Sequence, residues 1–170
     1  MTSFFDLAAS RYSVRSYEDR SIEPDVLAQV LEAGRIAPTA HNDQPQRIMV
    51  LTDAGDLAKV DECTRCRFGA PAVLLICYDK DVCWKRPYDG ALSGEVDASI
   101  VTTHIMLAAH DLGLGTCWVM YFDAAKAVEV FGLPENIIPV AMLPIGFPAG
   151  DARPSPMHGN RVEIGSILLN

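Results

Sequence analysis

The chain has 170 residues, of which 49% are hydrophobic and 21% charged, a composition typical of a globular protein, so we expect a single domain over residues 1–170. Its formal net charge of −8, from 14 basic and 22 acidic residues, argues against a general nucleic-acid-binding surface. No apolar run approaches the roughly 20 residues that a membrane helix needs. No basic region precedes an apolar stretch at the N-terminus, so we expect a cytoplasmic protein that binds neither nucleic acid nor membranes.

The first half of the chain alternates helical and extended patterns. Leu27, Val30 and Leu31 share one face of a helix that begins at Pro24, a residue favoured in the first helical turn. Asp53 is suited to cap a later helix. The sequence therefore predicts, in order, a helix at 3–9, an extended segment at 12–17, a helix at 24–36, a strand at 47–52, a helix from 53 to about 63 and a buried strand at 72–78.

The second half contains the longest predicted helix, at residues 95–112. Its apolar side chains occupy most of the helix circumference, so we expect it to be central, and Gly113 is suited to end it. The other expected elements are a polar loop at 79–94, a short strand at 116–119, a helix at 123–131, a strand at 137–146, a loop at 148–160 and a last strand at 162–169. Helices and strands intermix without strict strand–helix–strand alternation, which predicts an α+β domain.

The chain has five cysteines and no export signal, a combination that predicts free thiols. Cys77 lies in an apolar run and Cys117 follows a glycine-rich turn, so both are expected to be buried. Cys63 and Cys66 form a CxxC pair, which leaves a zinc or thiol module as an alternative. A second CxxC is missing, and a polar stretch precedes this one, so we favour ordinary surface or core cysteines and expect no metal site.

A first candidate site is the segment Arg11-Tyr12-Ser13-Val14-Arg15. In an extended segment, Arg11, Ser13 and Arg15 point to one face. Two guanidinium groups and a hydroxyl that converge in this way can bind an anion, because arginine matches phosphate oxygens with two parallel hydrogen bonds. Taken alone, the segment is explained better by two solvated surface arginines.

A second candidate is the polar loop at residues 37–45, between a predicted helix and a predicted strand. Asn42 and Gln44 carry both donors and acceptors, which suits the mixed polar edge of a flavin or a ribityl chain. A turn stabilised by Asn42 explains the same residues.

A third candidate, residues 112–118, contains a Gly-x-Gly. It ends a helix and lacks a third glycine, so it does not fit a dinucleotide-binding loop, which follows a strand and opens a helix. The sequence shows no pattern typical of a catalytic nucleophile, a metal-binding histidine pair or paired carboxylates. We therefore expect a bound cofactor to supply the chemistry.

Taken together and in this order, these motifs resemble those of the nitroreductase family. Its members begin with Arg-x-Ser-x-Arg after a first short helix and continue with Ala-Pro-Ser/Thr-Ala-x-Asn-x-Gln-Pro, which matches residues 37–45. Their long central helix runs into Gly-Leu-Gly-Thr-Cys-Trp, here residues 113–118, and a strand end follows that is matched by Pro-Ile-Gly-Phe-Pro-Ala at residues 144–149. Each motif is weak singly, but the four are in register over nearly the whole chain.

The resemblance implies a mostly antiparallel sheet flanked by helices, in an intertwined homodimer whose C-terminal segments extend onto the partner. It also implies FMN at the dimer interface and NADH or NADPH as the reductant. The implied FMN contacts are Arg11, Ser13, Arg15 and Arg161 at the phosphate and ribityl end, Asn42 and Gln44 from their loop, the backbone of Trp118, Val119 and Met120 near the isoalloxazine ring, and Pro38 and Thr39 at the flavin of the other subunit.

The chain departs from the family pattern at several positions. Family members often have an aromatic residue where Gln46 stands and small residues where Met120 and Tyr121 stand, so a narrower substrate cavity is expected. The usual Lys-Pro after the last arginine is replaced by Val162-Glu163, which leaves the extent of C-terminal exchange open.

The polar loop at 79–94 has two interpretations. With Trp84, Arg86 and Tyr88, it is a candidate lid or substrate wall, and an ordinary surface loop explains it as well.

From these observations we expect an enzyme that transfers hydride from NAD(P)H through the flavin to a nitroaromatic, quinone or related acceptor, with ping-pong kinetics at one shared site. Specialised reactions such as reductive dehalogenation or flavin fragmentation are alternatives within the family, and their enzymes usually carry extra lid segments. A non-enzymatic flavin-binding or redox-sensing protein is the alternative from another class.

Overall fold

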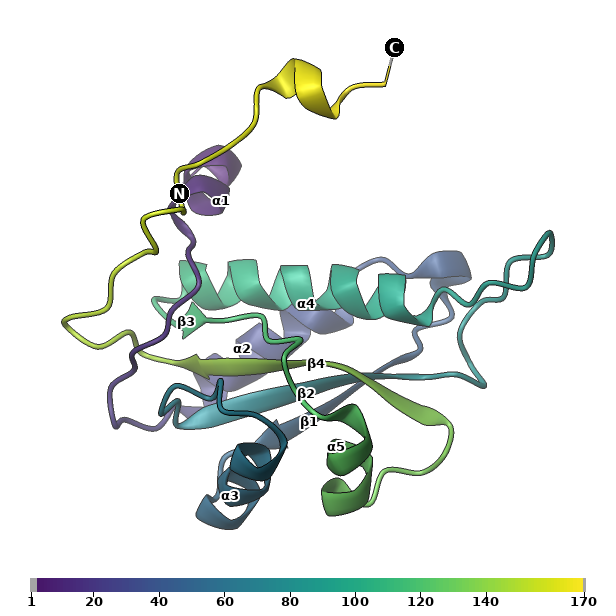
Figure 1. Cartoon of the computed structure of the whole chain (residues 1–170), viewed down its shortest axis with the longest axis horizontal. Coiled ribbons are helices and arrows are strands. Elements are labelled where there is room, and N and C mark those ends of the chain that lie inside the picture. Colours follow the sequence, from purple (N-terminus) through teal and green to yellow (C-terminus); the bar gives the residue numbers. More distant parts are fainter. Residues whose placement is uncertain (1–2, 170) are drawn as a thin grey trace.

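The computed structural model describes residues 3–169, so Met1, Thr2 and Asn170, the ends of the predicted single domain, lie outside the described residues. Among those residues, four strands form one antiparallel sheet in the order β1-β2-β4-β3, with helices on both faces (Figure 1). The α+β prediction is therefore confirmed. The strands are β1 (Gln46–Leu51), β2 (Ala72–Asp79), β3 (Gly115–Thr116) and β4 (Ile137–Gly146). The helices are α1 (Phe4–Ser10), α2 (Pro24–Arg35), α3 (Ala54–Cys63), α4 (Gly94–Asp111) and α5 (Ala124–Phe131). Two short 3-10 turns are η1 (Ala40–Asn42) and η2 (Ile164–Ile167).

The core lies on both faces of the sheet because its central strand β2 is buried along its whole length. α2 and α4 pack on one face, and α3 and α5 pack on the other (Figure 1). Side chains alternate between the faces of a strand. Leu74 and Ile76 accordingly join the cluster under α2 and α4, whereas Leu75 and Cys77 join the cluster under α3 and α5.

The helix boundaries follow capping residues that are visible in the sequence. The side chains of Ser3, Asp53 and Asp123 each accept a hydrogen bond from a backbone N–H three residues further on. These bonds satisfy donors that the first turns of α1, α3 and α5 otherwise leave free. Gly132, at φ +62°, ends α5, and Gly113, at φ +80°, follows α4, as expected for the left-handed residue after a helix.

α4 is central, as predicted. Val101, Ile105 and Ala109 are buried in the cluster that it forms with α2 and the sheet. The two helices approach so closely at Gly34 that a Cβ atom there would lie 2.8 Å from Cδ1 of Ile105. On the outer side of α4, Val96 is 61% exposed, so the apolar surface of this helix continues beyond the core. Within residues 3–169, no helix is long and apolar enough to cross a membrane.

The prediction of a last strand at 162–169 was wrong. The segment contains only the turn η2 and projects past α1, away from the sheet (Figure 1). A strand needs a neighbouring strand to bind its backbone groups, and among residues 3–169 none pairs with this segment. Its apolar side chains are exposed, Ile164 by 74% and Ile167 by 69%.

The prediction of a strand at 116–119 was correct in place but too long. β3 comprises only Gly115–Thr116, and an isolated pair between Val119 and Met142 follows it. Beyond β3 the chain therefore stays beside β4 with irregular pairing, through Cys117 and Val119.

Candidate functional site

The segment that carries the predicted anion-binding residues lies at the edge of the sheet. The N–H group of Val14 donates to the carbonyl of Thr116 in β3 at 2.9 Å. Val14 is buried and lies so close to Gly115 that a Cβ atom on this glycine would be 2.4 Å from Cγ2 of Val14. Because side chains alternate along an extended segment, the face opposite Val14 carries the three predicted side chains, Arg11, Ser13 and Arg15.

A pocket of about 270 Å³ opens between this segment and the loop that follows β4. Ser13 and Arg15 line it from one side, and residues of the loop at 155–158 line it from the other. His158 holds this loop in place, because its Nε2 lies 3.2 Å from the carbonyl of Ala9. Arg161 follows the loop without lining the pocket, and its guanidinium donates to the carbonyl of Asn160 at 2.8 Å.

The arginines of this region carry uncompensated charge. Within the described part of the chain, no carboxylate forms an ion pair with Arg11, Arg15 or Arg161, whereas five other arginines are paired with Asp or Glu. The charges act on neighbouring groups. Burial raises the pKa of the Cys117 thiol and Arg15 opposes that shift. Burial and then Arg11 lower the pKa of His110. A local excess of positive charge in a chain of net charge −8 favours an anionic ligand.

The segment after β3 leaves backbone donors free at the sheet edge. The N–H groups of Cys117 and Val119 donate to carbonyls of β4 at 3.2 and 2.9 Å, and the carbonyl of Val119 accepts from β4 at 3.0 Å. The intervening N–H groups point the other way. Within residues 3–169, no protein atom accepts a hydrogen bond from the N–H of Trp118, Met120 or Tyr121. Of the three predicted backbone positions, Trp118 and Met120 thus keep a donor for a ligand, whereas the backbone of Val119 is already engaged.

The segment that contains the CxxC stabilises the backbone conformation at Met120 and Tyr121. The hydroxyl of Thr64, a buried residue, donates to the carbonyl of Tyr121 at 2.6 Å and accepts from the N–H of Cys66 at 3.1 Å. The guanidinium of Arg65 lies 5.2 Å from the centre of the Tyr121 ring. The sequence pattern drew attention only to the two cysteines of this segment and gave no sign of the role of the residues between them. All five cysteines are free thiols in the structure.

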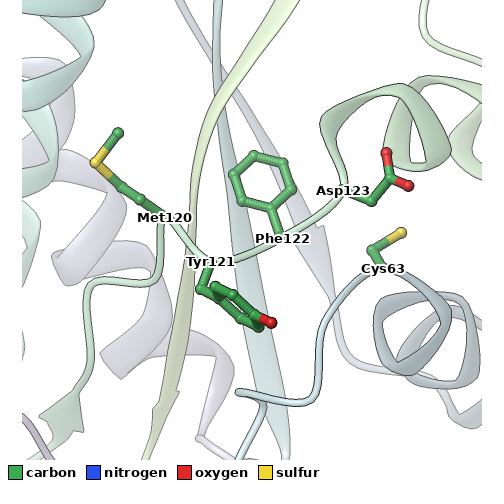
Figure 2. Close-up of a pocket in the computed structure, with 5 residues that line it drawn as sticks. All are labelled: Cys63, Met120, Tyr121, Phe122 and Asp123. Carbon is green, nitrogen blue, oxygen red and sulfur yellow. The ribbon is translucent and has the colours of Figure 1, made fainter.

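A second pocket, of about 370 Å³, lies beside the same turn. Figure 2 shows the side chains of Met120, Tyr121 and Phe122 leaving the chain in different directions, with Cys63 at the end of α3 close to Asp123 at the start of α5. Met120 and Tyr121 are 69% and 67% exposed. The two positions where the sequence has bulk in place of small residues therefore do form a cavity wall.

The predicted amide loop at 37–45 is fixed to the other end of α4. The N–H group of Ala40 donates to the buried carboxylate of Asp97 at 2.8 Å, and the Ser93 hydroxyl donates to the second oxygen of that carboxylate at 2.7 Å. Asn42 and Gln44 are exposed and have positive φ angles of +58° and +51°. Non-glycine residues in this region are uncommon, and they concentrate at functional sites. Asp97 could not be identified from the sequence, because its position on a helix gave no sign of its loop partner.

The two halves of the predicted site lie at opposite ends of α4 within one chain. Asp97, in the first turn, holds the amide loop, whereas His110, in the last turn, is the residue whose pKa Arg11 affects. α4 has 18 residues, so its ends are about 27 Å apart at 1.5 Å per residue. The loop, with Pro38, Thr39, Asn42 and Gln44, and the segment with Arg11, Ser13 and Arg15 are therefore not brought together in a single chain (Figure 1).

Comparisons of sequence and of structure with known proteins all find similarity to nitroreductases. The sequence model of the family described as "Nitroreductase family" matches residues 8–67 and 57–147. A protein of Archaeoglobus fulgidus assigned as an NADH dehydrogenase/NAD(P)H nitroreductase is 34% identical over 148 residues, which are 82% of this chain and 82% of that protein. The crystal structure of a nitroreductase family protein from Clostridium difficile 630 has a TM-score of 0.93 and 39% identity, and the alignment covers 99% of this chain and 98% of that one. An FMN-dependent nitroreductase from Clostridium difficile R20291 has a TM-score of 0.76 and 26% identity, with 89% and 91% of the two chains covered.

The role of Thr64 predicts a specific effect on stability. Thr64→Val keeps the shape of the side chain but leaves the carbonyl of Tyr121 and the N–H of Cys66 without their partner, so we expect the free energy of unfolding to fall by about 1–3 kcal/mol. Thr64→Ser keeps the hydroxyl and loses one methyl group, at about 0.8 kcal/mol. Urea unfolding of the two variants measures the difference, and equal losses would show that the hydroxyl contributes nothing.

Proposed function

This chain belongs to the nitroreductase family, and on that premise we propose that it works as a homodimeric FMN-dependent NAD(P)H oxidoreductase with quinones or nitroaromatic compounds as acceptors. NADH or NADPH supplies the electrons, and reductant and acceptor occupy one shared site in turn. The observation that carries the proposal is the group of uncompensated arginines beside free backbone N–H groups at one sheet edge.

The residues at this edge fit FMN. Arg11, Ser13 and Arg15 would hold a terminal phosphate. Ser13 and Arg15 line the pocket, and Arg161 follows the loop that lines its other side. A terminal phosphate is what distinguishes FMN from FAD, and guanidinium groups bind such a dianion through charge-assisted hydrogen bonds. The free N–H groups at Trp118 and Met120 would donate to acceptor atoms of the flavin ring. When bound, FMN supplies a group that takes up two electrons and releases them again.

The side chains of this protein then bind and orient the participants. The arginines fix the phosphate end, and the backbone at Trp118 and Met120 fixes the ring edge. The exposed side chains of Met120 and Tyr121, which line the pocket in Figure 2, would limit which molecules reach the ring. Within residues 3–169, no glycine-rich strand–turn–helix loop offers a separate nucleotide site, which supports one site that serves both substrates.

The distance between the two half-sites supports a site that is shared with a second copy of the chain. If the α4 helices of two chains run antiparallel, the first turn of each meets the last turn of the other. Asn42 and Gln44 of one chain then come beside Arg11 and Arg15 of its partner. The apolar side chains that are exposed in the single chain, on α4 at Val96 and in the segment at 164–169, support this assembly, because a partner would bury them.

We expect Arg15→Ala to weaken FMN binding about tenfold or more, because a hydrogen bond to a charged group contributes roughly 1.5–3 kcal/mol. Titration of apoprotein with FMN, followed by flavin fluorescence, measures this. Arg35→Ala is the matched control, because Arg35 lies on α2, is 68% exposed and is paired with Glu32. Equal affinities for FMN in the two variants would mean that Arg15 is only a surface charge.

We expect the holoprotein to sediment as a dimer, at twice the chain mass of 18.5 kDa, and to resist dilution. Val96→Asp places a carboxylate on the outer face of α4, where burial of an unpaired charge is unfavourable. Sedimentation velocity and flavin content should therefore report loss of dimer and loss of FMN together. A stable monomer that retains FMN would contradict the assembly.

The kinetics test the shared site. Initial rates measured against NAD(P)H at several fixed quinone concentrations should give parallel double-reciprocal lines, because one substrate must leave before the next binds. Intersecting lines, together with direct evidence that both substrates bind at once, would show a second site.

A further inference from the structure

The segment that carries the predicted phosphate contacts is anchored to the rest of the chain at two points. The first is Val14, which is bonded to Thr116 in β3 as described above. The second is Tyr17, which pairs with Pro148 as an antiparallel bridge, and backbone hydrogen bonds of 2.9 and 3.0 Å flank this pair. Arg15 lies between the two anchors and, among residues 3–169, forms no backbone hydrogen bond of its own. The direction of its side chain therefore depends on how the stretch between the anchors is held.

The hydroxyl of Tyr17 bonds the middle of this stretch. It lies 2.9 Å from the carbonyl oxygen of Val14 and 3.2 Å from that of Pro144 in β4, so its one proton is shared between two acceptors. Burial raises the pKa of the hydroxyl well above its usual range, although the charge of Arg15 opposes this shift. The hydroxyl is therefore a donor at neutral pH, and both backbone groups of Val14 are bonded.

The peptide group between Val14 and Arg15 depends on this hydroxyl in particular. Its carbonyl accepts from Tyr17, and its N–H group, that of Arg15, has no protein acceptor among residues 3–169. The guanidinium of Arg15 depends on the same stretch, because its Nη1 donates to the carbonyl of Ser13 at 3.2 Å. Loss of the hydroxyl would leave this peptide free to rotate, and Ser13 and Arg15 would no longer share one fixed face.

The second acceptor of the hydroxyl links the two parts of the candidate site. The carbonyl of Pro144 also accepts from the N–H of Cys117 at 3.2 Å, and Cys117 directly precedes Trp118, the first residue with a free N–H group. One carbonyl of β4 is thus bonded to the arginine segment through Tyr17 and to the donor segment through the backbone. Tyr17 itself does not line the pocket, so its effect on a ligand acts through the backbone that it holds.

We propose that Tyr17 is a positioning residue for the phosphate of FMN, and that its hydroxyl fixes the peptide between Val14 and Arg15 so that Ser13 and Arg15 face the ligand together. The inference rests on the proposed FMN site and goes beyond it, because it assigns part of the affinity to a side chain that does not contact the cofactor. Groups that are fixed before the ligand arrives lose less conformational entropy when it binds.

The test is a double-mutant cycle. Apoprotein is titrated with FMN, followed by flavin fluorescence, for the wild type, Tyr17→Phe, Arg15→Ala and the variant that combines both changes. We expect Tyr17→Phe to weaken FMN binding about fivefold or more, as loss of one hydrogen bond does. The combined variant should bind FMN within about twofold of Arg15→Ala, because the hydroxyl acts through that guanidinium. Tyr17→Met, which also lacks the hydroxyl and can fill the same space, replaces Tyr17→Phe if that variant does not fold.

Val30→Ala is the matched control for a general loss of stability, because Val30 is fully buried in the core between α2 and α4. Urea unfolding should show a loss of stability in Val30→Ala and in Tyr17→Phe, but only Tyr17→Phe should weaken FMN binding. The phosphorus-31 resonance of bound FMN reports on the phosphate alone. We expect it to move in Tyr17→Phe toward its position in Arg15→Ala and to stay unchanged in Val30→Ala.

Three results would overturn the inference and leave the proposed function intact. The first is an unchanged FMN affinity in Tyr17→Phe. The second is a combined variant in which the two losses multiply, which would show that the hydroxyl acts independently of Arg15. The third is an equal loss of FMN affinity in Val30→Ala, which would show that stability alone accounts for the effect. A wild-type protein that binds no FMN would instead overturn the proposed function.

Discussion

The length of α4 and its burial are the constraint on which the candidate site depends. Val101 and Ile105 are fully buried between α2 and the sheet, so this helix can neither bend nor shift without loss of the core. The amide loop is bonded to its first turn through Asp97, and Ser10, the neighbour of Arg11, lies 2.9 Å from His110 in its last turn. No internal movement of one chain can close a distance set by a rigid helix. In the proposed dimer, cofactor binding and assembly of two chains would therefore be coupled, since a ligand that binds only the assembled form stabilises it.

The candidate site depends also on the edge of the sheet. An edge strand presents unpaired backbone groups that must be covered or used. Here β3 is only two residues long, and the extended segment at Val14 covers it on the outer side. Beyond that cover, the chain returns to β4 at Val119 and leaves alternate N–H groups free. The strand β3 thus anchors the arginine segment through Thr116 and leads directly into the segment with the free donors.

Within the described residues, the arginines of the candidate binding region have no carboxylate partner, unlike five arginines elsewhere on the surface. Surface ion pairs contribute little to stability, but they neutralise arginines that would otherwise attract anions. In this acidic chain five of the ten arginines have a carboxylate partner. Within residues 3–169, the five without one are Arg11, Arg15, Arg65, Arg153 and Arg161. Arg86, in the loop at 79–94, shows the opposite pattern, because its guanidinium is held by Asp89.

The sequence by itself determined most of the elements and the residue types of the site. Capping residues such as Asp53 and Asp123 and the apolar spacing of α4 act over three or four residues, so local patterns sufficed to place the helices, and the order of four motifs sufficed to identify the family. Three matters were decided only by the tertiary structure. The segment at 162–169 has strand-forming residues but no neighbouring strand to pair with, and hydrogen bonding between strands is not a local property. Thr64 and Asp97 support the site through bonds to residues 57 positions away in each case, a distance at which no sequence pattern reports a contact. Finally, Arg15 and Asn42 belong to the same predicted site but lie at opposite ends of α4, because a motif specifies which side chains are present and only the packing of a long helix specifies how far apart they are.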